Sequence, residues 1–246
     1  MRLLLDVGNT RLKWGLRTEG RWLSQGALDL ADLEFLGEVL AEAPTLESVA
    51  GVNVAGSEVA RRIGVALGHG LTPRWLGATA AAAGVENRYG TPERLGADRW
   101  AALVGAWGIQ GGACLVVTAG TATTVDVLDG AGVFQGGVIL PGFDLMRRSL
   151  ARDTAGLPYA EGRFQALPRD TANAIHTGCL LAQAGAVERM FQALADQPGA
   201  VCLLNGGAAA ILKPALGLPL REVPNLVLEG VARLVEWQEG RPRDAG

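Results

Sequence analysis

The chain has 246 residues, of which 49% are hydrophobic and 19% are charged, enough for one large domain or two modest ones. Its net charge of -3 excludes the strongly basic balance of proteins that bind nucleic acid without sequence preference. Three cysteines without a CxxC pair, and only two histidines, argue against a disulfide framework and a zinc or histidine-built metal site. With a strand-like first segment and no uncharged apolar run of about 18 residues, we expect a cytoplasmic protein without signal peptide or membrane segment.

The first stretch, MRLLLDVGNTRLKWGL, predicts a β-hairpin with a polar turn. Residues 3–5 are an apolar run, and residues 10–16 alternate apolar and polar side chains as a partner strand does. Gly8 and Asn9 are turn residues, since both tolerate positive φ. Asp6 ends the first strand, where its carboxylate could hold a cation, while the N–H groups of the turn could face an anion. The stretch suits the phosphates of a nucleotide with Mg²⁺; a hairpin turn with a solvated aspartate is the alternative.

Strands and helices alternate through the rest of the first half, which indicates an α/β unit with a mixed sheet. We expect strands at residues 21–27, 48–54 and 73–76, and helices at 30–40, 57–67 (with Ser57 as N-cap) and 99–107. Asp98 stands at the N-cap of the last of these helices, a common structural role worth ~1 kcal/mol. The polar loop before it is expected to line a cleft and contains Asn87, Arg88, Tyr89 and Arg94.

The second half repeats the beginning of the first. Gly111 and Gly112 resemble a hinge, and CLVVTAGTATTVDVLD follows with an apolar strand, a Gly120–Thr121 turn and an alternating strand. This weak repeat predicts two related α/β halves that face each other across a cleft, each with one phosphate-binding turn. We therefore expect two domains, residues 1–112 and 113–246.

The remaining elements are read from spacing and turn residues. A Gly-rich turn with a short strand is expected at 134–142, and a helix at 143–151 whose Arg147, Arg148 and Arg152 form a solvated face. Residues 157–169 are irregular, and the long helix at 171–195 carries small residues that suit either an internal contact or a dimer seam. A strand at 201–205 ends in Gly206–Gly207, and helices are expected at 208–213 and from 224 to 239.

Several motifs, read together, resemble the type III pantothenate kinases. They are DVGNT (6–10), GADR (96–99), AGTATT with Asp126 (119–124), GGVILPG (136–142) and NLVLEG (225–230). Turns like DVGNT recur across the actin, Hsp70 and sugar-kinase superfamily, but the set with GADR is more specific and covers nearly the whole chain. The resemblance implies an α/β fold of two RNase H-like domains with mixed sheets around a nucleotide cleft. It implies no Walker P-loop, and the chain has no GxxxxGK[ST] sequence.

The resemblance also implies a function. The chain would transfer the γ-phosphate of ATP to the pantothenate hydroxyl, giving 4'-phosphopantothenate in the first step of coenzyme A synthesis. Asp98 would be the general base, and Asp6 would hold Mg²⁺ through water. The ATP-binding residues would be Asp6, Val7, Gly8, Asn9, Thr10, Arg11, Leu12 and Lys13, with Thr121 from the second domain. The pantothenate-binding residues would be Tyr89, Gly96, Ala97, Asp98 and Arg99, with Thr171 reaching across the interface of a homodimer.

This chemistry suits the residue types. Phosphoryl transfer needs positioning and charge neutralisation more than covalent help. A carboxylate such as Asp98 can accept the hydroxyl proton late in the transfer. The guanidinium of Arg99 can face the pantothenate carboxylate, because a planar fork of donors matches a carboxylate.

The chain departs from the family at Thr118, where relatives commonly have an Asp that binds an activating monovalent cation. A threonine hydroxyl is neutral, so a requirement for K⁺ or NH₄⁺ is in doubt here. Ala208 also replaces a common acidic residue after Gly206–Gly207.

Two other functions stay open from the sequence. One is a non-catalytic accessory or regulatory protein on the same scaffold, against which the retained Asp6, Asp98, Arg99 and Thr121 argue. The other is a sugar kinase of the same fold, which Tyr89 together with GADR disfavours. Neither nucleic acid nor a membrane is an expected partner.

Overall fold

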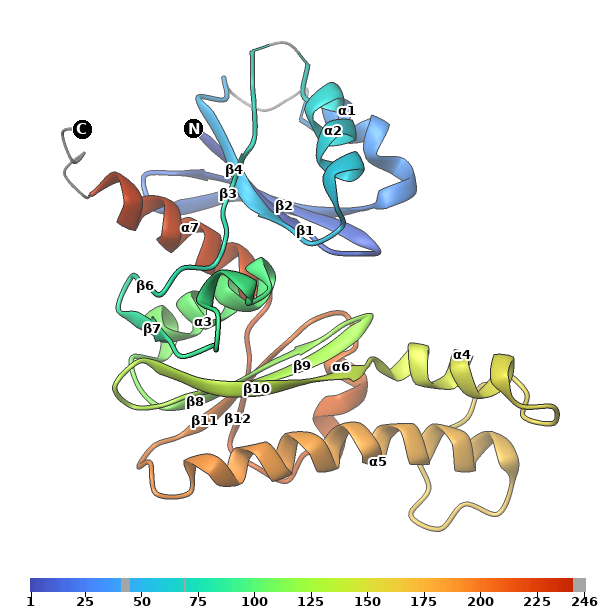
Figure 1. The fold of residues 1–246 in the computed structure, drawn as a ribbon. Coiled ribbons are helices and arrows are strands. Elements are labelled where there is room, and N and C mark those ends of the chain that lie inside the picture. Colours follow the sequence, from blue (N-terminus) through green and yellow to red (C-terminus); the bar gives the residue numbers. More distant parts are fainter. Residues whose placement is uncertain (41–44, 69, 241–246) are drawn as a thin grey trace. The chain divides into compact units, whose positions relative to one another are not determined.

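The structure is a computed structural model that describes residues 1–40, 45–68 and 70–240 (Figure 1). The chain forms two compact units. The first contains Met1–Ile109 together with the stretch that begins at Asn225, and the second contains Gln110–Pro224. The division into domains 1–112 and 113–246 stays a prediction, but the last helix groups with the first unit. Across the described ranges, no helix combines the length and the apolar character needed to cross a membrane.

The first unit is built on a mixed sheet. Its strands, in the order β3-β2-β1-β4-β5, are β3 (Arg21–Asp29), β2 (Arg11–Thr18), β1 (Arg2–Val7), β4 (Ser48–Asn53) and β5 (Arg74–Trp75). The pairs β1–β2 and β2–β3 are antiparallel, whereas β1–β4 and β4–β5 are parallel. The strands expected from apolar runs and alternation in this part of the chain are therefore confirmed.

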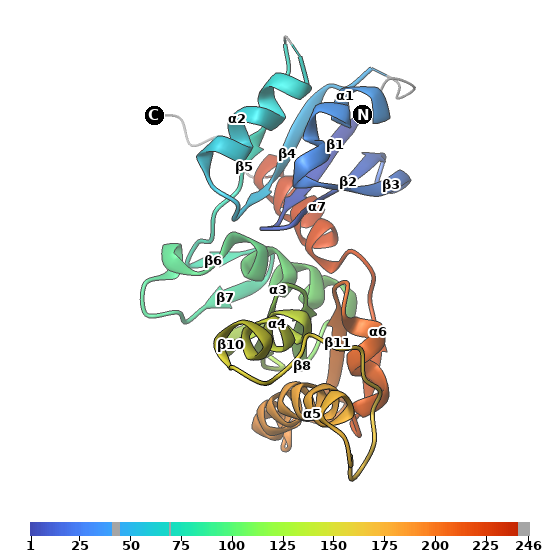
Figure 2. The same cartoon turned by 90° about the vertical axis from the view of Figure 1, so that its right-hand side faces the viewer.

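Each face of this sheet is covered by its own helices (Figures 1 and 2). Leu3, Leu5 and Val7 share a core with residues of η1 (Leu30–Phe35), α1 (Leu36–Val39) and α2 (Ser57–Ala66). Side chains alternate along a strand, so Leu4 and Asp6 face the other way. On that face α7 (Leu226–Glu239) packs against β1 and β4.

Several expected details of the first unit are wrong. The N-cap of α2 is Gly56, at φ 94°, and not Ser57. The expected helix at 30–40 is a 3₁₀ segment followed by a single α-helical turn. The sequence also missed a small hairpin, β6 (Ala81–Ala82) and β7 (Val85–Asn87), whose turn places Ala83 and Gly84 at positive φ. An alanine-rich stretch shows no alternation of apolar and polar residues that would indicate strands. Alanine rarely adopts positive φ, so it does not indicate a turn of this kind.

The second unit repeats the topology of the first. Its strands β12 (Leu220–Glu222), β11 (Val201–Asn205), β8 (Cys114–Ala119), β9 (Ala122–Leu128) and β10 (Val133–Pro141) lie in that order. The pairs β8–β9 and β9–β10 are antiparallel, and β8–β11 and β11–β12 are parallel. The predicted repeat of two related α/β halves with mixed sheets is thus confirmed. The strand expected to be short, β10, has nine residues.

The helices of the second unit cover one face of this sheet with an apolar core. They are α4 (Phe143–Asp153), α5 (Thr171–Phe191), η3 (Gln192–Leu194), α6 (Ala209–Leu212) and η4 (Lys213–Ala215). The expectation of a solvated arginine face on α4 is wrong for Arg147, whose side chain is only 11% exposed. Arg148 and Arg152 are exposed as expected.

In the first unit, the backbone of α7 lies directly against the backbone of α3 (Ala97–Gln110). The short η2 (Pro92–Arg94) precedes α3. A β-carbon at Gly230 would overlap the carbonyl group of Ala101, and one at Gly105 would press on the carbonyl oxygen of Leu226. Only glycine permits this approach. Polar contacts then hold α7 to the β2–β3 hairpin, since Trp22 Nε1 donates to Glu229 at 2.7 Å and Arg17 pairs with Glu236 at 3.1 Å.

We expect Gly230→Ala to lower the free energy of unfolding by about 2–3 kcal/mol, because the new methyl group forces two helix backbones apart. Gly108→Ala on α3 is the matched control, since its β-carbon would meet only the flexible end of Arg233. Urea denaturation measures both variants. Equal stability of the two would contradict the close helix approach.

Candidate functional site

The site in the first unit begins with a buried carboxylate. Asp6 lies next to the end of β1 and is 9% exposed. Burial raises its pKa from an ordinary 3.8 to about 6; Lys13, its partner across β2, lowers the pKa, and Asp98 raises it again. Burial disfavours the charged form of an acid, and a nearby negative charge does the same. The charge of Asp6 is therefore favoured by Lys13 and disfavoured by Asp98 within this unit.

The turn after Asp6 is tight but does not use positive φ. The N–H of Gly8 donates to the carbonyl of Arg11 at 3.0 Å, and neither Gly8 nor Asn9 is among the residues with positive φ. The predicted turn is therefore confirmed, but it forms without positive φ, and the bond from Gly8 to Arg11 closes the hairpin between β1 and β2. Asn9 and Thr10 are exposed, as a ligand-binding turn requires.

The other expected ATP-binding residues differ in whether their side chains or only their backbones could contact a nucleotide. Val7 and Leu12 are core residues, both 0% exposed, so that only their backbones could face a nucleotide. Arg11 is exposed and pairs with Asp29 at 2.9 Å. Lys13 is partly buried and pairs in register with Asp6. Among the expected ATP-binding residues, it is the positively charged one beside the Asp6 carboxylate.

Asp98 lies in the first turn of α3, not at its N-cap as expected. The N–H of Trp100 donates to the carbonyl of Gly96, so the helix starts earlier, with Gly96 at the cap. The Asp98 carboxylate accepts the N–H of its neighbour Arg99 at 2.8 Å and makes no ion pair among the described residues. A β-carbon at Gly96 would lie 2.8 Å from Oδ1 of Asp98, so glycine here leaves room for the carboxylate.

A loop held by a buried amide lies just before α3. Asn87 is 5% exposed; its Nδ2 donates to the carbonyls of Thr79 and Pro92, and its Oδ1 accepts the N–H of Tyr89. Asn87 is thus a support for the loop and not part of its surface. Tyr89 lines an open pocket of about 520 Å³ with Gly90, Thr91 and Arg94. The guanidinium of Arg99 lies 5.9 Å from the centre of the Tyr89 ring, so these two expected pantothenate residues are in contact.

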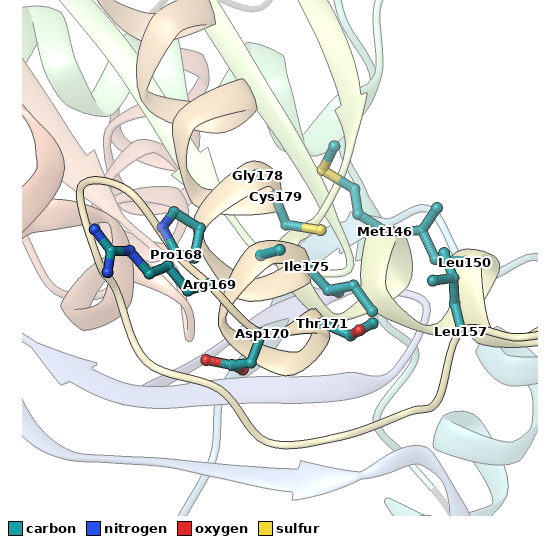
Figure 3. Close-up of a pocket in the computed structure, with 11 residues that line it drawn as sticks. Met146, Leu150, Leu157, Pro168, Arg169, Asp170, Thr171, Ile175, Gly178 and Cys179 are labelled. Atoms are coloured by element: carbon teal, nitrogen blue, oxygen red, sulfur yellow. The ribbon is translucent and has the colours of Figure 1, made fainter.

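In the second unit, Thr171 is the first residue of α5 and lies at a pocket of about 640 Å³ (Figure 3). The residue before it, Asp170, caps the helix by accepting the N–H of Asn173, which lowers the pKa of Asp170. Leu150 and Leu157 lie on one side of the pocket and Pro168 and Arg169 on the other (Figure 3). The pocket is mainly apolar, with Thr171 and Asp170 at its polar end.

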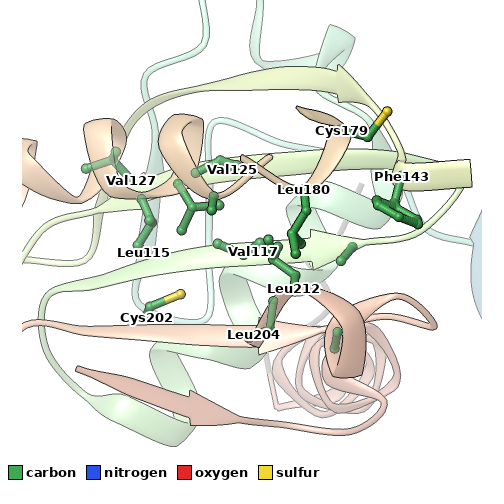
Figure 4. Packing of buried hydrophobic residues seen from close by; sticks show 14 of the residues in the cluster. Leu115, Val117, Val125, Val127, Phe143, Cys179, Leu180, Cys202, Leu204 and Leu212 are labelled. Carbon is green, nitrogen blue, oxygen red and sulfur yellow. The ribbon is translucent and has the colours of Figure 1, made fainter. Parts of the chain in front are cut away.

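The second turn, at Gly120–Thr121, is enclosed by two glycine backbones. A β-carbon at Gly142 would overlap the Gly120 carbonyl, and one at Gly206 would overlap that of Ala119. The N–H of Gly142 donates to the carbonyl of Thr121 at 2.9 Å. The strands that carry the turn rest on an apolar core that includes Leu115, Val117, Val125 and Leu204 (Figure 4). These contacts give the GGVILPG and Gly206–Gly207 motifs a structural purpose, which is to fix the turn that exposes Thr121.

The residue that sequence reasoning missed is Asn205, at the end of β11. It is 1% exposed and pairs in register with Thr118. Its Nδ2 donates to the carbonyl of Val117 at 3.0 Å and to Oγ1 of Thr118 at 2.9 Å, while its Oδ1 is buried without a partner. A carbonyl can only accept, so the amide nitrogen must face these two oxygens. The only signal for this residue in the sequence was its position just before Gly206–Gly207.

Each unit therefore contains groups that suit an anionic ligand. The first unit brings together two carboxylates, a lysine and the Tyr89–Arg99 pair. The second unit holds Thr121 on a rigid turn and Thr171 at the start of α5. A buried carboxylate beside a turn can hold a cation, exposed turns can contact phosphate oxygens, and a carboxylate without a cation partner can accept a proton.

Comparison with solved structures supports the fold. The chain matches a protein of Campylobacter jejuni assigned to the Baf family of transcriptional activators, with a TM-score of 0.61 at 18% identity, covering 97% of this chain and 100% of that one. It matches a Sinorhizobium meliloti protein assigned as a 2-dehydro-3-deoxygalactonokinase, with a TM-score of 0.63 at 16% identity, covering 98% and 100%. At these identities the likeness establishes the fold alone.

Comparison of sequences establishes the family. Residues 2–193 match the family model of the type III pantothenate kinases. The chain is 56% identical to the type III pantothenate kinase of Aromatoleum aromaticum, over 94% of this chain and 96% of that protein. It is 50% identical to that of Azoarcus sp., over 94% and 89%. The chain belongs to the type III pantothenate kinase family.

Proposed function

We propose that this chain transfers the γ-phosphate of ATP to the hydroxyl of pantothenate, giving 4'-phosphopantothenate for coenzyme A synthesis. The observation that carries the proposal is the presence of two carboxylates in the first unit, the buried Asp6 and the Asp98 of α3, alongside family membership. Two carboxylates with different surroundings suit two roles. One is buried at a turn and can position a cation with phosphates, and the other lacks a cation partner and can act on a hydroxyl.

Asp98 is the general base of this proposal. The acceptor hydroxyl loses its proton as its oxygen attacks the γ-phosphorus, and the Asp98 carboxylate takes that proton while ADP leaves. Tyr89, Gly96 and Ala97 shape the pantothenate site beside it. Arg99 faces the pantothenate carboxylate, which a planar guanidinium recognises through paired hydrogen bonds.

ATP is held by the first turn, from Asp6 to Lys13, and by Thr121 of the second turn. Bound Mg²⁺ supplies neutralisation of the phosphate charge. The residues fit this ion: Asp6 offers one buried carboxylate, and the described ranges contain no group of three acidic, histidine or cysteine side chains. Mg²⁺ usually takes one or two carboxylates and completes its shell with water and substrate phosphates, so a lone Asp6 is sufficient.

A monovalent cation fits the second turn poorly. The hydroxyl of Thr118 is neutral, and the amide N–H of Asn205 points at it. A donor in that position repels a cation, since its hydrogen carries a partial positive charge. K⁺ or NH₄⁺ therefore has no carboxylate partner at Thr118, and we propose weak dependence on either ion.

The active form is a homodimer in this proposal, with Thr171 contributing to the pantothenate site of the partner subunit. The pocket beside Thr171 is apolar, and the exposed Tyr159, Phe164 and Leu167 lie on the segment that borders it. An exposed apolar patch of this kind is typical of an interaction surface. ATP and pantothenate are metabolites of the cytoplasm, where the proposal places the reaction.

We expect Asp98→Asn to lower kcat by about 10²–10⁴-fold, because the amide cannot accept the hydroxyl proton. The amide oxygen can still accept the Arg99 N–H, so the fold should persist. Pantothenate-dependent release of ADP measures the loss, and the exposed Asp153→Asn is the control. In the same assay Arg99→Ala should raise the KM for pantothenate. Full activity of Asp98→Asn would reduce Asp98 to a structural role.

We expect Asp6→Asn to stabilise the metal-free protein at pH 8 by up to about 3 kcal/mol, the cost of a pKa raised by about two units. Between about pH 4 and 6 the folded chain holds a proton that the unfolded chain releases, so the free energy of unfolding falls as the pH rises. The gain should vanish below about pH 4. Thermal denaturation from pH 4 to 8 in EDTA, with the exposed Asp32→Asn as control, tests this. A variant less stable than the wild type at pH 8 would contradict it.

We expect added K⁺ to raise the rate by less than about twofold at constant ionic strength, because Thr118 and Asn205 offer no charged ligand. Initial rates in KCl are compared with rates in tetramethylammonium chloride. A steep rise with KCl would show that other oxygens bind the ion. Thr118→Asp is the informative second variant, and its rate should respond to K⁺ more strongly.

A further inference from the structure

Arg147 is a buried cation that the proposed chemistry does not use. It lies on α4, and its guanidinium is stacked between two aromatic rings, 4.8 Å from the centre of Tyr159 and 5.5 Å from that of Phe143. It donates to the carbonyl of Ala160 at 2.7 Å and pairs with Asp144 at 3.2 Å. Both Tyr159 and Ala160 belong to the irregular segment 154–170, which we call the strap.

The strap has no helix or strand of its own, so its backbone groups need partners from elsewhere. Arg147 anchors it to α4 at Ala160. Asn173 and Thr177 anchor it to α5 by accepting the N–H groups of Arg163 and Gln165, at 2.8 and 3.1 Å. The strap is thus fixed at successive points by side chains of two helices.

The two ends of the strap border the pocket beside Thr171. Leu157 lines it from one end, and Pro168, Arg169 and Asp170 line it from the other, directly before Thr171 (Figure 3). The Arg147 anchor lies between these ends. Release of Ala160 and Tyr159 would therefore free the wall that contains Leu157, whereas Asn173 and Thr177 would still hold the rest of the strap to α5.

A contribution to the stability of the fold does not by itself explain why an arginine occupies position 147. Its Nε is buried without a hydrogen-bond partner. The pKa of His176 is lowered first by the burial of the histidine itself and then by the positive charge of Arg147. An incompletely satisfied buried cation contributes little to stability compared with an apolar side chain of similar volume. What the guanidinium supplies that an apolar side chain cannot is a directed bond to the Ala160 carbonyl.

We propose that Arg147 is a positioning residue for pantothenate, which fixes the strap at Tyr159 and Ala160 and thereby the Leu157 wall of the pocket beside Thr171. This inference rests on the proposed function, in which Thr171 contacts pantothenate. Arg147 acts through the strap and does not touch the reacting groups.

The test compares Arg147→Met with wild type in the full chain. Methionine keeps the stem but loses the charge and the bond to Ala160. We expect the KM for pantothenate to rise about tenfold while the KM for ATP stays within about twofold, since only the pantothenate wall is displaced. Hydrogen exchange of residues 154–170 should become faster, with the thermal midpoint little changed.

Two further variants separate positioning from general damage. Tyr159→Ala removes one stacking ring and should follow Arg147→Met, whereas Tyr159→Phe keeps the ring and should behave as wild type. Arg152→Met is the matched control, because Arg152 is exposed and pairs only with its neighbour Asp153 among the described residues.

Different outcomes overturn different conclusions. Faster exchange of the strap without a change in the KM for pantothenate would show that the strap positions nothing. An equal rise in both KM values, with a lowered thermal midpoint, would show a general structural role. If the wild type does not turn over pantothenate, the proposed function itself fails. If it does and Arg147→Met equals wild type, only the role of Arg147 fails.

Discussion

The carboxylate of Asp6 is buried at the end of β1, and burial makes its charged form less favourable. The first unit places a lysine and a second carboxylate near it. Lys13 on the neighbouring strand offsets part of the cost of this buried charge, while Asp98 adds to it. A carboxylate that is buried and short of positive charge favours a cation, and a turn with exposed Asn9 and Thr10 can contact an anion. The two together are prepared for a cation bound with a phosphate, which is how nucleotides enter kinases.

The two units share one strand order but stabilise their turns in different ways. In the first, a bond from Gly8 to Arg11 closes the turn beside a carboxylate. In the second, the backbones of Gly142 and Gly206 enclose the turn, and Asn205 bonds to Thr118. One topology thus presents a charged turn suited to Mg²⁺ and a neutral turn suited to phosphate contact alone.

Loops near the proposed substrate residues are held by side chains that bond to main chain. Asn87 supports the loop of Tyr89, and Arg147, Asn173 and Thr177 support the strap before Thr171. A loop cannot pair its own backbone groups, so buried amides, hydroxyls and guanidiniums take that role. In the proposed function, these residues position the groups that face the substrate and do not contact it themselves.

Local patterns in the sequence predicted most of the strands and helices and the positions of both turns. Alternation and apolar runs located the central strands, the repeat located both turns, and Asp6 could be singled out because its position at a strand end is local information. Only the tertiary structure decided that Asp98 is not a helix cap, that Arg147 is buried, and that Asn205 is bonded to Thr118. The physical reason is range: propensity and periodicity act between neighbours along the chain. Burial and hydrogen bonding also depend on distant segments such as β11, whose Asn205 lies 87 residues from Thr118 in the sequence.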